Sequence, residues 1–346
     1  MNTTSLFFAC GRPFSPIYSF LMRLRERAYW RGLFRRHSLP VPVISVGNLV
    51  LGGSGKTPTV AAICRHFLAM GEKPAVISRG YGGKAKAAVN VVSDGEEIFL
   101  DAAAAGDEPH MLAAMLPGVA VLTGRKRIFP CRRAVAMGCT ALVLDDGFQH
   151  LAIRRDVDLV LFNATTLAGN SRVFPGGELR EPVAALRRAS AFVLTGVDSH
   201  NRERAERFAD LLAGRFPGQP VFQTENILDA FVDQHGQAVA HLPAPLLAVS
   251  AIAHPERFHH LLADAGISLC GRLNFRDHHR YPPDAIERIA RQAREQGAAG
   301  FIVTEKDRVK LAARQLPLPL FAARISARLP PPLLALIDAA VAASPR

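Results

Sequence analysis

A glycine-rich loop that contains a lysine lies between an apolar run and a helical pattern. Residues 43–60 read VISVGNLVLGGSGKTPTV, and the loop supplies Gly52, Gly53, Ser54, Gly55, Lys56 and Thr57. Glycines let successive backbone N–H groups surround phosphate oxygens, the lysine reaches the β and γ phosphates, and the threonine hydroxyl ligates Mg²⁺. The usual motif begins with a glycine where this chain has Val50, but a strand before the loop and a helix after it are both expected. The loop therefore predicts binding of a nucleoside triphosphate.

A pair of acidic residues follows another apolar run. The segment ALVLDDGFQH places Asp145 and Asp146 directly after four apolar residues, with Gln149 and His150 close behind. A triphosphate loop needs a carboxylate at the end of a neighbouring strand to position Mg²⁺. A surface turn explains one Asp-Gly pair, but it explains two acids, a glutamine and a histidine at the exit of a buried strand poorly. We therefore expect this segment to position the metal.

Further polar clusters lie at strand exits or in loops of the same half of the chain. They are ISRGYGG with Arg79, GDEPH with Asp107, Glu108 and His110, TGRKR with Arg125, Lys126 and Arg127, and PGGELREP with Arg180 and Glu181. Ligands of doubly wound sheets bind beyond the carboxyl ends of the strands, so these loops could converge on the phosphate loop. Taken singly, each cluster is more typical of a solvated charged loop.

The second half of the chain carries two more polar segments. FRDHHRY sets Asp277, His278 and His279 together, which would suit a metal fragment or a histidine that reaches across a cleft to tune a carboxylate base. No third ligand at zinc spacing accompanies them. TEKD, residues 304–307, superficially resembles a guanine-reading loop, but its lysine is displaced by one position and predicts no guanine specificity.

Alternating apolar runs and helical patterns from about residue 41 to 226 predict the fold. They indicate a P-loop NTPase-like α/β fold, a parallel sheet with helices on both faces, followed by a smaller second α/β domain. We expect an N-terminal segment over 1–36, a core domain over 37–218, an extended connecting ribbon over 219–242 and the second domain over 243–346. Five separated cysteines without a C-x-x-C pair fit reduced thiols.

The positive charge of the chain is concentrated at its N-terminus. Residues 1–36 contain seven arginines and one glutamate, which accounts for half of the formal net charge of +12. Arginine mixed with aromatic residues, including the single tryptophan Trp30, is favoured in the headgroup layer of an anionic membrane. Charges interrupt the segment too often for a spanning helix. We expect an amphipathic, membrane-associating helix; the alternative is a helix packed on the protein's own surface.

Eight ordered segments together closely resemble the tetraacyldisaccharide 4'-kinase family, a lipid A pathway kinase of Gram-negative bacteria. They are VGNLVLGGSGKTPTV, SRGYGG, GDEP, LDDGFQH, LREP, HPERF, DHHRY and TEKD, and they run from about residue 13 to 310. The resemblance implies transfer of the γ-phosphate of ATP, with Mg²⁺, to the 4'-hydroxyl of tetraacyldisaccharide 1-phosphate, which gives lipid IVA. It implies a lipid acceptor at the cytoplasmic face of the bacterial inner membrane; we expect no nucleic-acid partner and no obligate protein partner.

The matched motifs imply roles for individual residues. These are catalysis for Asp107, His279, Lys56 and Arg125, nucleotide binding for Gly52, Gly53, Ser54, Gly55, Lys56, Thr57 and Asp146, metal binding for Thr57, Asp145, Asp146 and Glu181, and substrate binding for Arg79, Gln149, His150 and Arg180. His278 is the alternative to His279 as the partner of Asp107, and the neighbours of Arg125 offer two alternatives to it.

One turn of the second half departs from the family pattern, and two other ATPase functions are alternatives to the kinase. The family typically has GIGNPERF where this chain reads AIAHPERF, with Ala251, Ala253 and His254 substituted, so a nucleotide contact from that turn cannot be carried over. The main alternative is a membrane- or DNA-associated switch ATPase of the deviant P-loop class, but the signature lysine of that class falls at Leu51 here. A nucleic-acid-binding ATPase rests only on the high pI.

Overall fold

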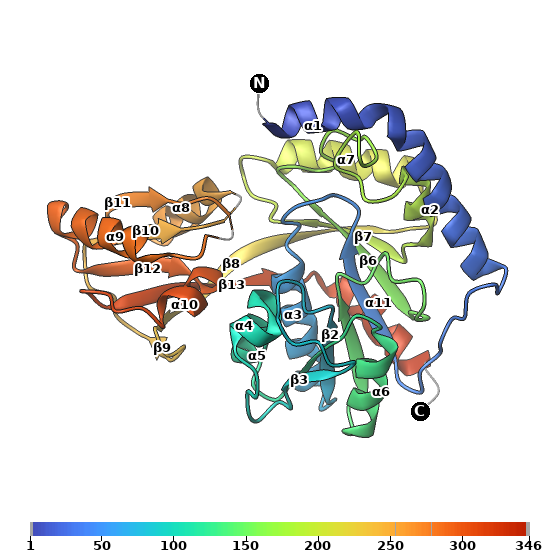
Figure 1. Ribbon diagram of the computed structural model, residues 1–346, viewed down its shortest axis with the longest axis horizontal. Helices are drawn as coiled ribbons and strands as arrows, with labels where there is room; N and C mark the ends of the chain where they lie inside the picture. Colours follow the sequence, from blue (N-terminus) through green and yellow to red (C-terminus); the bar gives the residue numbers. More distant parts are fainter. Residues whose placement is uncertain (1–2, 253, 278, 344–346) are drawn as a thin grey trace.

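The computed structural model describes residues 3–252, 254–277 and 279–343, which form two α/β units joined by a pair of long strands (Figure 1). The sheet of these residues runs in the order β11-β10-β12-β13-β8-β7-β6-β1-β5-β2-β4-β3, with β9 paired to β8. The expected α/β fold, with a mostly parallel sheet and a smaller second unit, is confirmed. Ala253 and His278, both named in the sequence analysis, lie outside the described residues.

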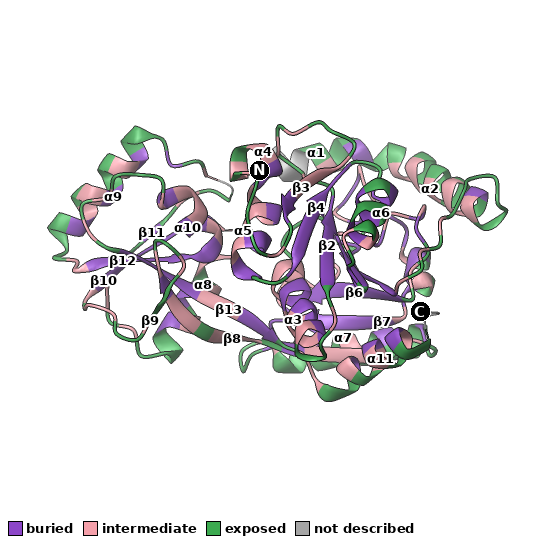
Figure 2. Cartoon of the chain, turned by 90° about the horizontal axis from the view of Figure 1, so that it is seen from below, coloured by how far each residue is buried: buried purple, intermediate pink, exposed green. Residues whose placement is uncertain are grey.

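The first unit is built on strands that are buried almost throughout (Figure 2). They are β1 (Val43–Asn48), β2 (Pro74–Ser78), β3 (Asn90–Ser93), β4 (Ala120–Thr123), β5 (Ala141–Asp145), β6 (Val157–Asn163) and β7 (Ala191–Thr195). All are parallel to their neighbours except β3, which pairs antiparallel with β4 at the edge. Continuous apolar runs suit this position because helices cover both faces of the sheet.

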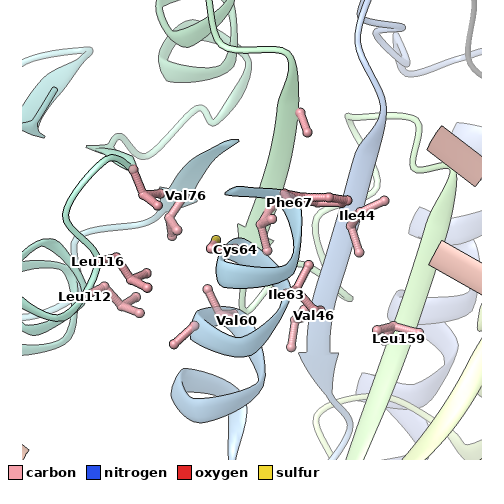
Figure 3. Packing of buried hydrophobic residues seen from close by; sticks show 14 of the residues in the cluster. Ile44, Val46, Val60, Ile63, Cys64, Phe67, Val76, Leu112, Leu116 and Leu159 are labelled. Atoms are coloured by element: carbon pink, nitrogen blue, oxygen red, sulfur yellow. The ribbon is translucent and has the colours of Figure 1, made fainter. Parts of the chain in front are cut away.

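Helices cover the sheet and complete the core of the first unit. They are α3 (Lys56–Ala69), α4 (Ala102–Ala105), α5 (Asp107–Met115), α6 (Ile128–Ala136) and α7 (Arg202–Arg215), with short 3-10 turns η1 (Arg12–Phe14) and η2 (Val183–Arg188). The apolar stripe of α3 packs Val60, Ile63, Cys64 and Phe67 against Ile44 and Val46 of β1 (Figure 3). This packing fixes the helix that begins at the phosphate loop. Burial also raises the pKa of the Cys64 thiol, and the five cysteines are free.

Two long strands connect the units. β8 (Val221–Asp233) first pairs parallel with β7 and then antiparallel with β13 (Leu320–Arg328), while β13 pairs parallel with β12. β8 and the short β9 (Ala238–Val239) cover most of residues 219–242. β8 therefore belongs to the sheet of both units and does more than connect them.

The second unit repeats the α/β alternation on a smaller scale. It contains β10 (Leu246–Ser250), α8 (Pro255–Asp264), β11 (Leu269–Asn274), α9 (Pro283–Glu295), β12 (Gly300–Thr304) and α10 (Glu305–Leu311). β10 lies between β11 and β12, parallel to both. The core of this unit is formed by buried side chains such as Leu247, Val249, Phe301 and Val303.

The last helix departs from the expected division of the chain at residue 243. α11 (Pro331–Ala343) lies with the first unit, away from β10, β11 and β12 of the second (Figure 1). Its buried Leu333, Ile337 and Val341 belong to the same apolar core as α3, and Asp338 contacts His66 at 2.7 Å. The reason is that β13 runs back along β8 and delivers the chain to the first unit.

The N-terminal segment forms α1 (Thr3–Gly11) and α2 (Ser15–Trp30), which run along the outside of the first unit (Figure 1). Within the described part of the chain, none of the helices combines the length and apolar character that crossing a membrane requires.

Candidate active site

The phosphate loop connects β1 to α3 and has the backbone that an anion site needs. Gly52 and Gly55 have φ values of 118° and 74°, in the left-handed region that favours glycine. A Cβ at Gly55 would lie 2.8 Å from the hydroxyl oxygen of Thr195, so a side chain has no room there. Because α3 starts at Lys56, its unpaired N–H groups face the loop. The loop can therefore surround phosphate oxygens with N–H donors.

The position of Val50 shows why this loop does not need the usual first glycine of the motif. The valine side chain is buried in an apolar core, and the residue forms an antiparallel bridge with Leu179. The N–H of Leu51 donates to the carbonyl of Glu178 at 2.8 Å. The start of the loop is thus tied to the segment that carries Arg180, and the glycines needed for phosphate contact come after it.

Lys56 is held at the mouth of the loop. Its Nζ lies 3.3 Å from Asn48 Oδ1 and 3.5 Å from Ser54 Oγ. It also forms an ion pair with Asp146 at 3.5 Å. The ammonium group is therefore oriented by three neighbours before any phosphate is present.

Asp145, at the end of β5, has a free carboxylate oxygen in a buried position. Its Oδ2 accepts a hydrogen bond from Ser78 at 3.2 Å, whereas the buried Oδ1 has no hydrogen-bond partner among the described residues. Burial, reinforced by Glu108, raises the pKa of Asp145 to about 6. A buried carboxylate oxygen without a partner suits a cation, since the ion would satisfy it.

Asp146 is the centre of a cationic cluster. Arg180 Nη1 donates to both of its carboxylate oxygens, at 2.9 and 2.7 Å. Arg127 Nη1 donates to its backbone carbonyl at 2.8 Å. Burial alone would raise the pKa of Asp146, but Lys56 and Arg180 outweigh it and lower the pKa. The residue has a φ of 53°, which turns the chain sharply after β5.

The arginine that reaches the acidic pair from TGRKR is Arg127. Arg125 and Lys126 are exposed, whereas Arg127 is buried and directly precedes α6. Burial lowers the pKa of Arg127, and Asp145 and Asp146 oppose that shift. The structure thus places one of the two alternatives to Arg125 in the site, and no local pattern in TGRKR distinguishes these three basic side chains.

Two of the predicted substrate residues, Gln149 and His150, lie in the loop that follows β5. Gln149 Nε2 donates to the backbone carbonyl of Asn48 at 2.9 Å. The backbone carbonyl of Gln149 accepts from Arg25 of α2 at 2.9 Å. Burial is the main cause that lowers the pKa of His150 to about 3, and nearby arginines lower it further. This imidazole is therefore neutral at physiological pH. Arg79 is exposed at the end of β2.

Glu181, also predicted as a metal ligand, contacts two arginines. Its carboxylate is bound by Arg188 at 2.5 Å and lies 4.0 Å from Arg25. No cluster of three or more His, Cys, Asp or Glu side chains that could hold a metal ion occurs among the described residues. Glu181 therefore takes part in an arginine network, and a metal at Asp145 needs the Thr57 hydroxyl, phosphate oxygens or water as its further ligands.

Asp107 contacts the second unit through a lysine. It is the first residue of α5, and its Oδ2 lies 3.3 Å from Nζ of Lys310 in α10. The same Nζ donates to the backbone carbonyl of His279 at 3.3 Å. The His279 ring stacks on Phe275 with centroids 4.7 Å apart, and its Nδ1 accepts from the N–H of Tyr281 at 3.1 Å. Among the described residues, Lys310 therefore connects Asp107 to the His279 segment.

Comparison with known proteins identifies the family. The model of the family described as "Tetraacyldisaccharide-1-P 4'-kinase" matches residues 8–342. The chain belongs to this family. A "Tetraacyldisaccharide 4'-kinase" of Desulfotalea psychrophila is 48% identical over 326 residues, 94% of each chain, and one of an Anaeromyxobacter species is 42% identical over 88% of this chain and 83% of its own. The alternative of a switch ATPase is not favoured.

A solved structure supports the same assignment. It is the "apo" form of LpxK from Aquifex aeolicus in complex with ATP, with a TM-score of 0.76 and 30% identity, and the alignment covers 95% of this chain and 98% of that one. The chain is thus an ATP-dependent kinase of lipid A biosynthesis, and its phosphate loop, Lys56 and Asp145 suit ATP with Mg²⁺.

Two residues of this kinase that the sequence analysis missed connect the second unit to the phosphate loop. Arg257 of α8 donates from Nη1 to Asn163 Oδ1 at 3.1 Å, and its Nη2 donates to the carbonyl of Gly196. Asn163 Nδ2 in turn donates to the carbonyl of Gly53 at 3.4 Å. Arg257 stands in the quoted segment HPERF, so the motif was visible, but its partner at the end of β6 was not.

The substituted turn before α8 is anchored by other contacts. The N–H of Ala251 donates to Asp307 at 3.0 Å, and His254 precedes α8 with its ring 3.4 Å from Glu256. The turn of this kinase is thus fixed to α10, the helix that carries Lys310.

Proposed function

We propose that this chain transfers the γ-phosphate of ATP to the 4'-hydroxyl of tetraacyldisaccharide 1-phosphate, giving lipid IVA. One observation carries the proposal: the family match spans residues 8–342 and so includes both the phosphate loop before α3 and the start of α5 at Asp107. Glu108, the neighbour of Asp107, contributes to the raised pKa of Asp145, so the first turn of α5 lies close to the acidic pair. Donor and acceptor groups can therefore meet at this point.

The phosphate loop and Lys56 would hold the donor. Loop N–H groups and the ammonium of Lys56 bind the phosphates, and the pre-existing contacts of Nζ with Asn48 and Asp146 reduce the reorganisation needed on binding. Thr57 and Asp145 would ligate Mg²⁺, which supplies neutralisation of charge on the phosphate oxygens. Asp146, held by Arg180, would keep Lys56 and the neighbouring metal ligands in position.

Asp107 would accept the proton of the 4'-hydroxyl. Its side chain is 36% exposed, so a sugar hydroxyl can approach it. Phosphoryl transfer depends mainly on positioning and electrostatic stabilisation, so the base must be held in line with the loop. We assign His279 to the support of this region, where its ring stacks on Phe275. Gln149, His150, Arg79 and Arg180 would contact the headgroup of the acceptor.

Helix α2 supports action at an anionic membrane surface, the cytoplasmic face of the bacterial inner membrane. Its outer face exposes Ile17, Phe20, Leu21 and Leu24, which recur at helical spacing. Arg36 stacks on exposed Trp30 at 4.7 Å from the ring centroid, which joins a cation to an interfacial aromatic residue. This apolar face with its arginines suits the headgroup layer.

The inner face of α2 contacts the site itself. Tyr18 donates to the carbonyl of Arg180 at 3.0 Å, and Arg25 donates to that of Gln149 at 2.9 Å. A groove beside α2 is lined by Arg12, Arg23, Arg172, Phe20 and Val173, among others. It combines guanidinium groups with apolar side chains, as an acylated and phosphorylated acceptor requires. The helix therefore connects a lipid surface to the residues that would bind the headgroup.

The deciding experiment follows the phosphate. Purified protein in mild detergent is incubated with Mg²⁺, γ-labelled ATP and tetraacyldisaccharide 1-phosphate, and the lipid is separated by chromatography. We expect label in the lipid, and loss of that label in Lys56→Ala, with Lys73→Ala as a control because Lys73 is exposed at the opposite end of β2. Label released only as inorganic phosphate, with stimulation by vesicles or DNA, would contradict the proposal and favour a switch ATPase.

A further inference from the structure

Lys310 occupies an unusual position between the two units. Its Nζ lies 3.3 Å from the Asp107 carboxylate of the first unit and 3.3 Å from the His279 carbonyl of the second. The lysine side chain is only 10% exposed, so its ammonium group is largely shielded from water, whereas the Asp107 side chain is 36% exposed. Partial burial strengthens such a pair relative to a surface salt bridge.

The helix that carries Lys310 is itself firmly anchored. α10 begins after Thr304, whose hydroxyl oxygen accepts from the N–H of Asp307 and donates to its carboxylate. The Asp307 carboxylate also accepts from the N–H of Ala251. One turn before Lys310, Lys306 contacts Asp277 at 3.1 Å. Two lysines on the same face of α10 therefore hold the segment that contains His279.

We propose that Lys310 is a positioning residue of the phosphoryl transfer, which orients the Asp107 carboxylate and ties its orientation to the contact between α5 and α10. The inference rests on the proposed role of Asp107 as the base. Lys310 binds Oδ2, and the exposure of the Asp107 side chain leaves the carboxylate accessible to an acceptor hydroxyl. The base is thus aligned when the second unit lies against the first.

The ion pair gives Lys310 a role beyond packing, because it holds the carboxylate of the proposed base. Asp107 stands at the first position of α5, and its side chain is 36% exposed. Lys310 is the ion-pair partner of Asp107 within the described residues. Misplacement of a reacting group by about 1 Å can lower a rate ~100-fold, so loss of this partner should affect the chemical step.

The test is a double-mutant cycle in the labelled-lipid assay. Turnover at saturating MgATP and acceptor is compared for wild type, Lys310→Met, Lys310→Arg, Asp107→Ala and the Asp107→Ala/Lys310→Met double variant. Lys73→Met serves as the control because it removes an exposed lysine of the first unit, directly before β2. Binding of a non-hydrolysable ATP analogue and thermal unfolding are measured for each variant.

We expect Lys310→Met to lower kcat by roughly 10- to 100-fold while ATP-analogue affinity and thermal unfolding change little. Arginine should restore part of the loss, since it keeps the charge. In the Asp107→Ala background, Lys310→Met should have no additional effect, because its action passes through that carboxylate. A kcat of Lys310→Met within twofold of wild type, or an equal further loss in the double variant, overturns the inference. Absence of labelled lipid with wild type overturns the proposed function and the inference with it. Full activity of Asp107→Ala leaves the proposed function standing but overturns the assignment of Asp107 as the base, and with it the inference.

Discussion

Arg180 binds Asp146 through one nitrogen that donates to both carboxylate oxygens, at 2.9 and 2.7 Å. Lys56 contacts the same carboxylate, 3.5 Å from Oδ1. Two cations thus share one acid at the mouth of the phosphate loop. Because Arg180 binds Asp146, we expect Asp146 to hold Lys56 less tightly, which leaves the lysine free to bind a phosphate.

Replacing Arg180 by glutamine should weaken nucleotide binding. Without the guanidinium, Asp146 is left with Lys56 as its close cation, and the lysine is drawn away from the phosphates. We expect the affinity for a MgATP analogue to fall about tenfold, which corresponds to about 1.4 kcal/mol. Calorimetric titration measures it, and Arg154→Gln is the control because Arg154 is exposed. Unchanged affinity in Arg180→Gln would show that Lys56 is not limited by this acid.

Asp145 should make the metal-free protein less stable as the pH rises. Its folded pKa of about 6 lies above 3.8, the ordinary pKa of an aspartate, so between these pH values the folded state binds more protons than the unfolded state. The stability contribution is complete below pH 3.8 and is lost as the pH rises through 6. Each pKa unit corresponds to about 1.4 kcal/mol, so the loss amounts to about 3 kcal/mol.

Asparagine at position 145 should remove this loss. The amide keeps the shape and can still accept from Ser78, so Asp145→Asn should be more stable than wild type at pH 7.5 and similar at pH 4. Urea unfolding without Mg²⁺ at both pH values provides the comparison. The same variant should lose the stabilisation that wild type gains from added MgATP. Equal stability of the two proteins at pH 7.5 would mean that Asp145 ionises there without cost.

The α/β fold could be predicted because its signals are local. Each buried parallel strand appears as a short apolar run, and the stripe of α3 repeats at helical spacing from Val60 to Phe67. The place of α11 could not be predicted in this way. Its contact with the core of the first unit depends on the antiparallel pairing of β13 with β8, which joins residues about one hundred positions apart.

The candidate site shows the same limit. The glycine loop, Lys56 and the acidic pair follow directly from residue type and order. The choice of Arg127 over Arg125 depends on which side chain the start of α6 directs inward. Lys310 was invisible in the sequence because its partner Asp107 lies in another unit. Contacts across units are set by packing, and no local pattern records them.

Arg257 should couple the second unit to the phosphate loop. It reaches Asn163, which in turn contacts the carbonyl of Gly53, so Arg257→Ala should loosen both the loop and α8. We expect faster amide hydrogen exchange in residues 52–57 and at least a fivefold loss of turnover. The control is Arg207→Ala, because Arg207 pairs with Glu203 on the exposed face of α7. Exchange confined to α8, with the loop unchanged, would contradict the coupling.

Phe20→Glu should reduce association with anionic vesicles without reducing the stability of the fold. Phe20 is 61% exposed on the outer face of α2, so a carboxylate there removes apolar area from the interface and is repelled by anionic lipid. We expect at least tenfold weaker sedimentation with vesicles of anionic phospholipid. Phe99→Glu is the matched control, since Phe99 is 52% exposed on the loop after β3. Equal sedimentation of both variants and wild type would mean that α2 does not form the contact with lipid.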